Sequence, residues 1–434
     1  MMKKEDFLHF LWKYLLFDRQ HTTTTSGEEI EVVSPGQHNT DAGPDFFNAK
    51  IRIGGTLWAG NVEIHFRASD WKRHAHHHND AYHNVILHVV TENDDVIVRN
   101  DGQAVPAFVM TYDPVLEDRY KALLAAPLPV PCAPHVRHIQ PIHMIHFLGR
   151  LLVERLELKA ENIKQALAFT NNEWNAAFHQ LLFHAFGFGI NTAAFELLAK
   201  NTPYKVTGKH RNTLLQLEAL LFGQAGMLQG PAKDEYHGML QKEYCFLQEK
   251  FRLVPLEAHL WKFLRLRPSN FPTIRLAQLA QFLHRAPPII HLMEAWDKHS
   301  ERELYALFDL QASEYWDTHF VFGKPSPPQP KKLGQASIYN LIVNLAIPYL
   351  FTYAQYHRYD SLRETALELL EKCPPEENHI LRQWQQIGVK AQNAFHSQAL
   401  IQLQTAYCDK KRCLYCPVGA EIIFPLSSFR QAGG

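Results

Sequence analysis

The sequence predicts an α+β fold, with a mixed β-sheet flanked by helices in the N-terminal part and a large all-helical domain after it. Two observations lead to this prediction. Strand-like apolar patterns gather before residue 100, whereas apolar residues recur at three- and four-residue spacings from Met144 onward. The chain has 434 residues, of which 46% are hydrophobic and 20% charged, so it is long enough for two or three domains with sizeable cores.

The segment 1–17 predicts an amphipathic helix. Two lysines precede an apolar run, but Glu5, Asp6, His9 and Lys13 interrupt that run, and the small-residue cleavage site of a signal peptide does not follow it. No apolar run in the sequence is long enough to cross a bilayer. We therefore expect a soluble, cytoplasmic protein with reduced cysteines and no membrane contact.

Strand patterns follow the first helix. A nearly continuous apolar run, as in the last of the four main segments, is typical of a buried strand. The four segments are Glu29–Ser34, Phe46–Ile53, Leu57–Phe66 and Val85–Val90, and Val96–Val98 adds an expected edge strand. Residues 68–82 are polar and rich in histidine, which predicts a loop and a short helix. The order helix, three strands, helix, strand indicates an α/β unit around a mixed sheet.

The composition changes at Pro127–Pro134 (PLPVPCAP), where the strand signals stop, so we place a domain boundary there. Helical spacing then recurs in several segments, namely Met144–Leu167, Trp174–Phe186, Thr213–Phe222, Asn340–Tyr356 and Ser361–Leu370. We predict three parts: an α/β domain over residues 1–125, a helical domain over 135–404, and a C-terminal tail with three cysteines over 405–434.

The charge balance restricts the function. The chain carries 44 basic and 44 acidic residues and has a formal net charge of +0. It therefore lacks the bulk positive field that draws many proteins to nucleic acid. A nucleic-acid partner would have to be bound by local basic patches, and protein partners cannot be inferred from the sequence.

Asp45, Glu63 and His65 form the strongest candidate site. Alternation along Leu57–Phe66 places Glu63 and His65 on one strand face, which we expect to line a cleft, and Asp45 follows a Gly-Pro corner at the start of the neighbouring strand. Phosphodiester hydrolysis uses a hard cation such as Mg²⁺ or Mn²⁺, held by one or two carboxylates. A basic group beside them orients the attacking water or stabilises charge on the phosphate. Each residue alone is commonplace on a turn or a solvated strand, but the combination indicates a metal site.

The histidines of the following segment extend this site. His74 and His76 are candidates for orienting the water, together with Asp80. His77 and His78 fit solvated rings at least as well as metal ligands, because consecutive histidines cannot all point at one ion. The remaining histidine of this region, at position 88, lies in the expected buried strand and is interpreted as a hydrogen-bonded core residue.

A second candidate metal site lies in the C-terminal tail. Cys408, Cys413 and Cys416 have the spacing Cys-x4-Cys-x2-Cys, which in a reducing compartment favours a metal over a disulfide. We choose Cys132 as the fourth ligand, because Cys245 and the cysteine at position 373 fall inside or at the end of helical segments. Four thiolates hold zinc or an iron–sulfur cluster, and the alternative is a group of free thiols in a terminal loop. The Lys-Lys-Arg run between the thiolates could contact phosphates.

The phrases GPDF and VEIH resemble the two signature motifs of the PD-(D/E)XK nuclease superfamily. The resemblance implies a restriction-endonuclease-like sheet and catalytic roles for Asp45, Glu63 and His65, although His65 stands where that superfamily usually has lysine. The stretch HFRASDWKRHAH is similar to very short patch repair endonucleases, which implies that Trp71, His74 and His76 lie near the site. Nucleases of this superfamily with iron–sulfur clusters also join one early cysteine to three late ones.

Longer phrases, including GNVEIHFRASDWKRHAHHHNDAY, RPSNFPTIRLAQLA and YCDKKRCLYCPVG, resemble one bacterial family, domain of unknown function 2851, over almost the whole chain. The resemblance implies a cytoplasmic bacterial protein and no particular activity. The sequence therefore leaves two hypotheses. One is a metal-dependent nuclease that cleaves DNA or RNA. The other is a non-catalytic scaffold, or a module that binds nucleic acid or protein, on a degenerate nuclease fold.

Overall fold

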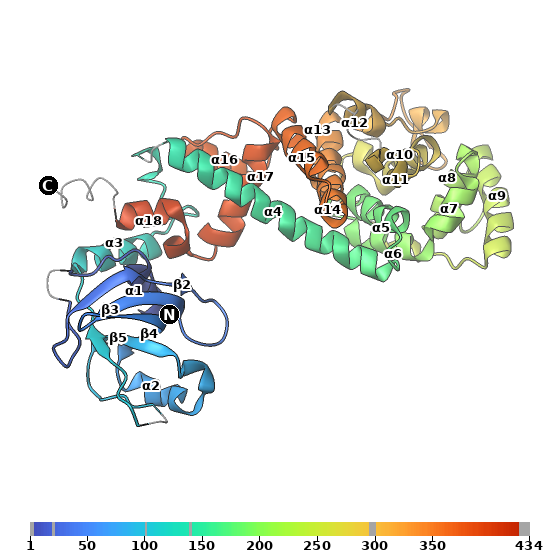
Figure 1. The fold of residues 1–434 in the computed structure, drawn as a ribbon. Helices are drawn as coiled ribbons and strands as arrows, with labels where there is room; N and C mark the ends of the chain where they lie inside the picture. Colours follow the sequence, from blue (N-terminus) through green and yellow to red (C-terminus); the bar gives the residue numbers. More distant parts are fainter. Residues whose placement is uncertain (1–3, 20–21, 100–101, 139–140, 295–300, 425–434) are drawn as a thin grey trace. The chain divides into compact units, whose positions relative to one another are not determined.

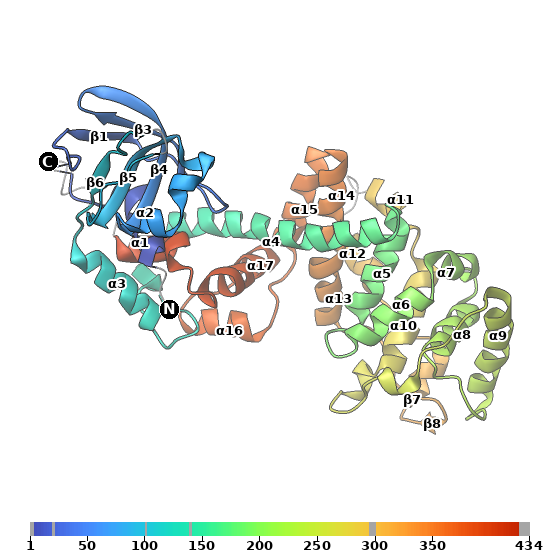
Figure 2. The same ribbon diagram turned by 90° about the horizontal axis from the view of Figure 1, so that it is seen from below.

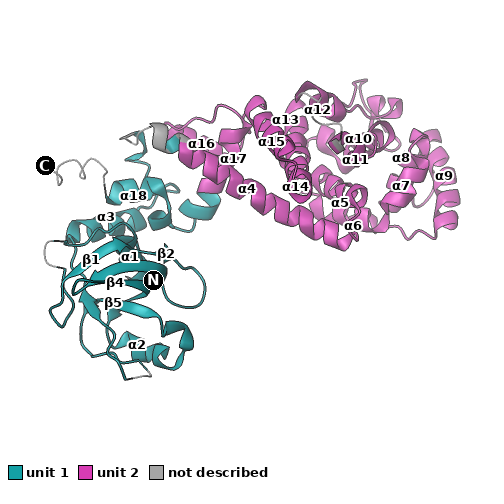
Figure 3. Cartoon of the chain, viewed as in Figure 1, with its two compact units in different colours: residues 1–144, 404–434 teal, residues 145–403 magenta. Residues whose placement is uncertain are grey.

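The computed structural model describes residues 4–19, 22–99, 102–138, 141–294 and 301–424. It confirms the α+β class, with a mixed N-terminal sheet and a largely helical remainder (Figure 1). The chain divides into two compact units, residues 1–144 with 404–434, and residues 145–403 (Figure 3). The expected C-terminal tail, residues 405–434, belongs to the segment 404–434 that groups with the first unit.

The sheet of the first unit has the order β1-β3-β4-β5-β6, and β2 pairs with β3. Its strands are β1 (Ile30–Ser34), β2 (Gln37–His38), β3 (Phe46–Ile53), β4 (Thr56–Arg67), β5 (Val85–Glu92) and β6 (Ala107–Val109). The pairs β1–β3 and β3–β4 are antiparallel, whereas β4–β5 and β5–β6 are parallel. Gly54 and Gly55 make the turn between β3 and β4, where both have positive φ, a conformation that glycine adopts without strain.

Two helical segments pack against β4. Helix α1 (Lys4–Lys13) buries its apolar stripe, and the Trp12 indole donates a hydrogen bond to the Pro35 carbonyl at 3.0 Å. The segment between β4 and β5 contains α2 (Asp70–Arg73) and two single 3₁₀ turns, η1 (His76–His78) and η2 (Asp80–Tyr82). In Figure 2, α2 lies beside β4 and β5. A parallel strand pair needs such a crossover, which here carries the histidines.

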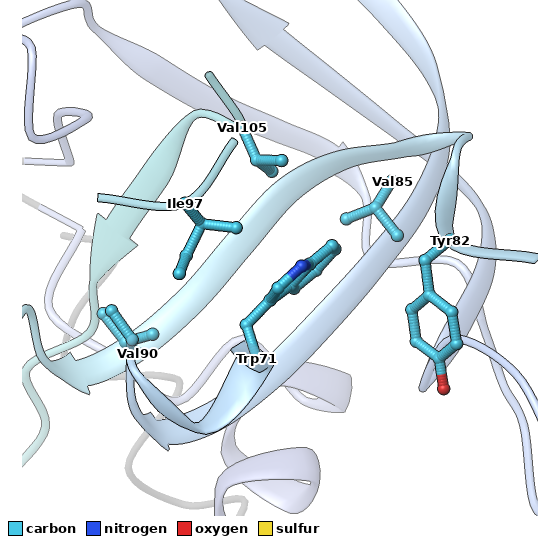
Figure 4. Close-up of a cluster of buried hydrophobic side chains, with 7 residues drawn as sticks. Trp71, Tyr82, Val85, Val90, Ile97 and Val105 are labelled. Atoms are coloured by element: carbon cyan, nitrogen blue, oxygen red, sulfur yellow. The ribbon is translucent and has the colours of Figure 1, made fainter. Parts of the chain in front are cut away.

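The crossover is fixed to the sheet by a hydrophobic cluster centred on Trp71 (Figure 4). Its ring lies among Val85, Val90, Ile97 and Val105, and it is 1% exposed. Burying one large aromatic side chain stabilises a fold by about 2 to 3 kcal/mol relative to leaving it in water. The cluster therefore holds the backbone of residues 69–82 against the sheet.

The expected edge strand at Val96–Val98 is wrong. Val98 makes only an isolated bridge with Ala104, and Val96 is 70% exposed, so this stretch gains neither a ladder nor burial on both faces. The edge position beside β5 is taken instead by β6, which no sequence pattern predicted.

The first unit is completed by elements from both ends of the chain. They are α3 (Pro114–Ala125), η3 (Val136–His138), η9 (Leu403–Cys408), η10 (Cys413–Tyr415) and α18 (Pro417–Ile423). The Arg119 guanidinium donates to the Ile423 carbonyl at 3.1 Å, and the Gln404 amide donates to the Pro129 carbonyl at 2.9 Å. These bonds fix residues 404–424 to the segment that follows the sheet.

The second unit confirms the helical spacing of the sequence. Its longer helices include α4 (Pro141–Phe169), α5 (Trp174–Phe186), α6 (Thr192–Asn201), α8 (Leu214–Gln224), α9 (Glu235–Phe251), α10 (Pro272–Arg285), α14 (Ile347–His357) and α15 (Asp360–Lys372). Shorter ones are α7 (Tyr204–His210), α11 (Ile289–Glu294), α12 (Glu301–Phe308), α13 (Gln335–Leu341), α16 (His379–Gln386) and α17 (Ala394–Gln402). A two-stranded sheet of β7 (His319–Val321) and β8 (Lys324–Pro325) makes this unit largely helical rather than all-helical. Among the described helices, none is long and apolar enough to traverse a lipid bilayer.

Candidate functional site

A bulge in β3 brings Asp45 beside Glu63. Pairing runs in one register from Ile53 opposite Thr56 to Ala49 opposite Gly60, and then shifts so that Phe46 lies opposite Val62. Asn48 sits in this irregularity with a φ of 54°. Bulges of this kind bend a strand and redirect side chains. Here the bulge lies next to Asp45, at the point where β3 begins.

The two carboxylates are held together by the backbone. Glu63 Oε2 accepts a hydrogen bond from the Asp45 N–H at 3.2 Å, and Asp45 Oδ2 accepts one from the Ile64 N–H at 2.9 Å. Each carboxylate therefore accepts a hydrogen bond from a backbone N–H in the segment that carries the other carboxylate. This exchange fixes the position of both side chains without any metal.

Three imidazoles converge on the same place. The candidate ligand atoms of His65, His74 and His76 all lie within 4.8 Å of one another. His65 Nε2 is 3.1 Å from His74 Nδ1, and Glu63 Oε1 is 3.5 Å from His65 Nε2 and 3.1 Å from His76 Nε2. Nitrogen ligands on a tetrahedral ion with bonds of about 2.0 to 2.1 Å lie about 3.3 Å apart. The observed spacings suit one ion shared by these side chains.

The site is covered rather than open. We expected the polar face of β4 to line a cleft, but Glu63 and His65 are only 4% and 2% exposed. The reason is the crossover segment 69–82, which folds back over this face. His74 is exposed, and Asp45 and His76 are half-buried, so these three residues connect the buried carboxylate to solvent.

Electrostatics at the site favour a bound cation. Burial, and then the neighbouring Asp45 carboxylate, raise the pKa of Glu63 to about 9. Burial lowers the pKa of His65 to about 2, with a further contribution from His88, and lowers that of His76 to about 4, with a contribution from His74. Glu63 is therefore protonated and both imidazoles are neutral at pH 7. Neutral imidazoles are ready to ligate, and a cation would displace the proton from Glu63.

Buried nitrogens without hydrogen bonds support this assignment. Among the described residues, His76 Nε2 and His9 Nε2 are buried and form no hydrogen bond, although each lies near a carboxylate oxygen, at 3.1 Å from Glu63 and 3.2 Å from Asp45. Buried polar atoms are almost always satisfied, and an orphan calls for an explanation such as an ion. A cation between the imidazoles and carboxylates would supply it.

Two residues of the site were not foreseen as such. His9, on α1, lies near Asp45 although the two are far apart in the sequence. In the sequence, the one hint of this role is that His9 is a polar residue within the apolar stripe of the first helix. His88 is fully buried, as expected for a core histidine, and its Nε2 lies 2.9 Å from His65 Nδ1. Hydrogen bonds behind a ligand imidazole fix its tautomer and ring orientation, so His88 is a positioning residue.

The other histidines of the crossover lie outside the cluster. The rings of His77 and His78 contact each other, with centroids 3.9 Å apart and planes tilted by 45°. Asp80 is exposed and pairs with His83 at 3.4 Å rather than with an imidazole of the cluster. Trp71, expected near the site, packs edge-on against His76 while anchoring the hydrophobic cluster.

The four cysteines singled out by the sequence also come together. Cys132, Cys408, Cys413 and Cys416 are all buried and line one cavity. Both other cysteines belong to the second unit: Cys245 lies on α9, and Cys373 directly follows α15. Between the thiols, Lys411 donates to the Leu124 carbonyl, and the Arg412 guanidinium lies 5.0 Å above the Tyr415 ring. Both basic groups thus have partners within the first unit.

Comparison with known proteins identifies one family. The model of the family described as "Protein of unknown function (DUF2851)" matches residues 5–379. The match includes the carboxylates, the histidine cluster and Cys132, whereas the three late cysteines lie beyond it. No curated protein and no solved structure matches the chain. The resemblance to nucleases stays a prediction.

Proposed function

We propose that this chain, which belongs to the DUF2851 family of proteins of unknown function, binds a divalent cation at its carboxylate–histidine cluster and hydrolyses phosphodiester bonds of DNA or RNA. The observation that carries the proposal is the convergence of two carboxylates and three imidazoles around buried nitrogens that lack hydrogen bonds. Such an arrangement is costly for folding unless a ligand completes it.

The donor set favours Mn²⁺ over Mg²⁺. Magnesium prefers oxygen ligands and retains several waters, whereas imidazole suits transition metals. Glu63, His65 and His76 would supply one oxygen and two nitrogens, with His74 next to them. When bound, the cation would polarise a phosphoryl oxygen and lower the pKa of a coordinated water.

The side chains divide the remaining tasks. Asp45 keeps Glu63 oriented through the exchanged backbone bonds and faces the half-buried side from which a phosphate would arrive. His74 is exposed and lies beside His65, so it is placed to accept the proton of the attacking water. His9 lies 3.2 Å from Asp45 Oδ2 and would help to hold that carboxylate in place.

The order of elements supports nucleic acid as the substrate class. A helix, a three-stranded antiparallel meander, a short helical crossover and a parallel strand follow each other, which is the order that resemblance to the PD-(D/E)XK superfamily implies. By this analogy of fold, Asp45 and Glu63 would correspond to the acidic residues of that superfamily's two motifs, and a cleavage assay tests the substrate directly.

A second candidate function is a scaffold in which the cluster is only structural. The observation that favours it is the pairing of basic side chains around the crossover: Arg67 lies 3.0 Å from Glu92, Lys72 lies 2.6 Å from Asp95, and Arg73 lies 2.9 Å from Asp70. Nucleic-acid affinity depends on basic groups that neutralise phosphates. These three are already neutralised by the protein's own carboxylates.

Cleavage assays separate the two functions. Labelled single- and double-stranded DNA and RNA are incubated with the full-length protein in Mn²⁺, in Mg²⁺ and in EDTA. We expect cleavage in Mn²⁺ that falls at least 100-fold in Asp45→Asn and Glu63→Gln, and persists in the matched control His78→Ala, an exposed histidine of the same segment. Equal cleavage by all four proteins, or none by wild type on any substrate, would leave the scaffold as the function.

A further inference from the structure

The cysteine cavity of the first unit is built by two segments that are far apart in the sequence. Cys132 lies between α3 and η3, and the three others lie in and around η9 and η10. Exposed fractions of the four residues range from 6% to 9%, and all four line the same cavity. Four of the six cysteines in the chain thus share one buried place.

Local backbone geometry holds the thiol-bearing residues. The Lys411 N–H donates to the Cys408 carbonyl at 3.0 Å, with Lys411 in a left-handed conformation, and the Cys416 N–H donates to the Cys413 carbonyl at 3.2 Å. A Cβ on Gly419 would lie 2.2 Å from the Cys413 carbonyl oxygen, so only glycine permits this approach. The Cys132 carbonyl accepts from two N–H groups of the next turn, at 2.8 and 3.1 Å.

Packing alone does not account for this gathering. Four buried thiols from two distant segments line one cavity, which is the arrangement that holds a metal centre, since a metal binds the thiolate form of cysteine.

We propose that Cys132, Cys408, Cys413 and Cys416 hold a metal centre through their thiolates, and that this centre joins the C-terminal segment to the loop after α3. Four thiolates hold either a single zinc ion or an iron–sulfur cluster, and analysis of metal and sulfide distinguishes the two.

The test is metal and sulfide analysis of the full-length protein purified without oxygen, before and after reconstitution with ferrous iron and sulfide. We expect either one equivalent of zinc, or stoichiometric iron with acid-labile sulfide and broad visible absorption, and in either case the metal should be lost in Cys132→Ser and Cys413→Ser. Cys373→Ser, which changes a buried thiol in the second unit, should retain the metal. No metal in wild type, or undiminished metal in both variants, would overturn the site. The wild-type measurement holds even if a variant fails to fold.

An independent observation in the second unit concerns Arg275, on α10. This side chain is 6% exposed, and its guanidinium donates to three neutral acceptors: Gln278 Oε1 at 2.9 Å, Asn270 Oδ1 at 2.7 Å and Ser337 Oγ at 3.4 Å. No carboxylate pairs with it among the described residues. Burial alone lowers its pKa to about 10, so it stays charged at pH 7. A buried charge is normally paired, and this one lacks a counter-ion.

Arg275 lines a cavity of about 270 Å³ whose walls are mainly apolar and aromatic, including Phe186 and Phe195. The Phe188 ring lies 4.4 Å from the guanidinium carbon, and Phe188 itself has a positive φ of 42°, which is strained for an aromatic residue. We infer that the cavity binds a small organic carboxylate. Its single negative charge would meet Arg275, and its apolar body would meet the aromatic walls.

Benzoate and its neutral counterpart benzamide test this pocket. Benzoate should raise the melting temperature of wild type by a few degrees while benzamide does not, and Arg275→Met should lose the response. Ile190→Trp enlarges a half-exposed side chain of the cavity lining, leaves the charge in place, and should also lose the response. The pocket is ruled out if benzoate and benzamide act alike on wild type, or if both variants respond as wild type does.

Discussion

Two buried polar clusters of this protein differ in how completely they are satisfied. In the second unit, the half-buried Lys159 Nζ donates to three acceptors: Gln398 Oε1 at 2.7 Å, Asn344 Oδ1 at 2.8 Å and the Val343 carbonyl at 3.3 Å. In the first unit, buried nitrogens of the carboxylate–histidine cluster have no hydrogen bond among the described residues. A satisfied cluster stabilises the fold by itself, whereas an unsatisfied one implies a ligand.

We expect the largest loss of stability in the satisfied cluster around Lys159. Lys159→Ala removes three hydrogen bonds of this network and leaves a gap among its side chains, and should lower the free energy of unfolding by about 3 kcal/mol. Lys164→Ala, an exposed lysine of the same helix, is the control and should change it by less than about 0.5 kcal/mol. Denaturant unfolding measures both. Equal stability of the two variants would mean that the network does not act as described.

At Glu63, by contrast, we expect almost no loss of stability in the metal-free protein. Without metal, Glu63→Gln removes a carboxyl group that burial and Asp45 hold in its protonated form, and it keeps an oxygen to accept the Asp45 N–H. We expect the metal-free variant to be within about 1 kcal/mol of wild type, since the side chains are nearly isosteric. Stabilisation by Mn²⁺, measured as a shift in melting temperature, should be lost. A destabilisation as large as that of Lys159→Ala would remove the contrast between the clusters.

The pH dependence of the metal-free protein follows from the same groups. The pKa of Glu63 is raised from 4.5 to about 9, so its contribution to stability is complete below pH 4.5 and is lost as pH rises through 9. The pKa values of His65, His76 and His88 are lowered from 6.5, so their contribution is present above pH 6.5 and is lost as pH falls.

Stability in EDTA should therefore peak near neutral pH and decline on the alkaline side by on the order of 1 kcal/mol per pH unit. Glu63→Gln should flatten that alkaline decline and leave the acid limb unchanged. Denaturant midpoints measured from pH 5 to pH 9 give both limbs. If the variant keeps the alkaline decline, another group is responsible for it.

The smallest effect is expected at His78, which is exposed and lies outside the cluster. His78→Ala should change the free energy of unfolding by less than about 0.5 kcal/mol and leave Mn²⁺ binding intact. His76→Ala, two residues earlier, should weaken Mn²⁺ binding at least tenfold. If the two variants bind Mn²⁺ with similar affinity, His76 is not a metal ligand.

The local elements of the fold could be predicted from the sequence. Phe46–Ile53 and Trp174–Phe186 coincide with β3 and α5, because alternation and helical spacing are strong there and turn or capping residues end the patterns. The β6 strand could not be predicted, since its three residues become a strand through pairing with distant segments, mainly β5. The strand expected at Val96–Val98 did not form for a related reason. Its pairing with a neighbouring segment stops at one isolated bridge.

The candidate site was predictable only in part. The spacing of Glu63 and His65 follows from strand alternation, and the turn at Gly54 and Gly55 brings Asp45 near them. The burial of Glu63 depends on how the crossover segment folds back over β4, and the approach of His9 depends on how α1 packs there. Local patterns encode neither. The bulge at Asn48 also left no clear sequence signal.

Calorimetric titration of the full-length protein with Mn²⁺ at pH 7, in two buffers of different ionisation enthalpy, tests the central claim most directly. The protonated state of Glu63 predicts that one bound ion releases about one proton, so the apparent enthalpy should differ between the buffers. Glu63→Gln should bind more weakly and release none. If wild type binds no Mn²⁺, or if it binds with the same affinity and proton release as Glu63→Gln, these carboxylates and histidines do not form a metal site.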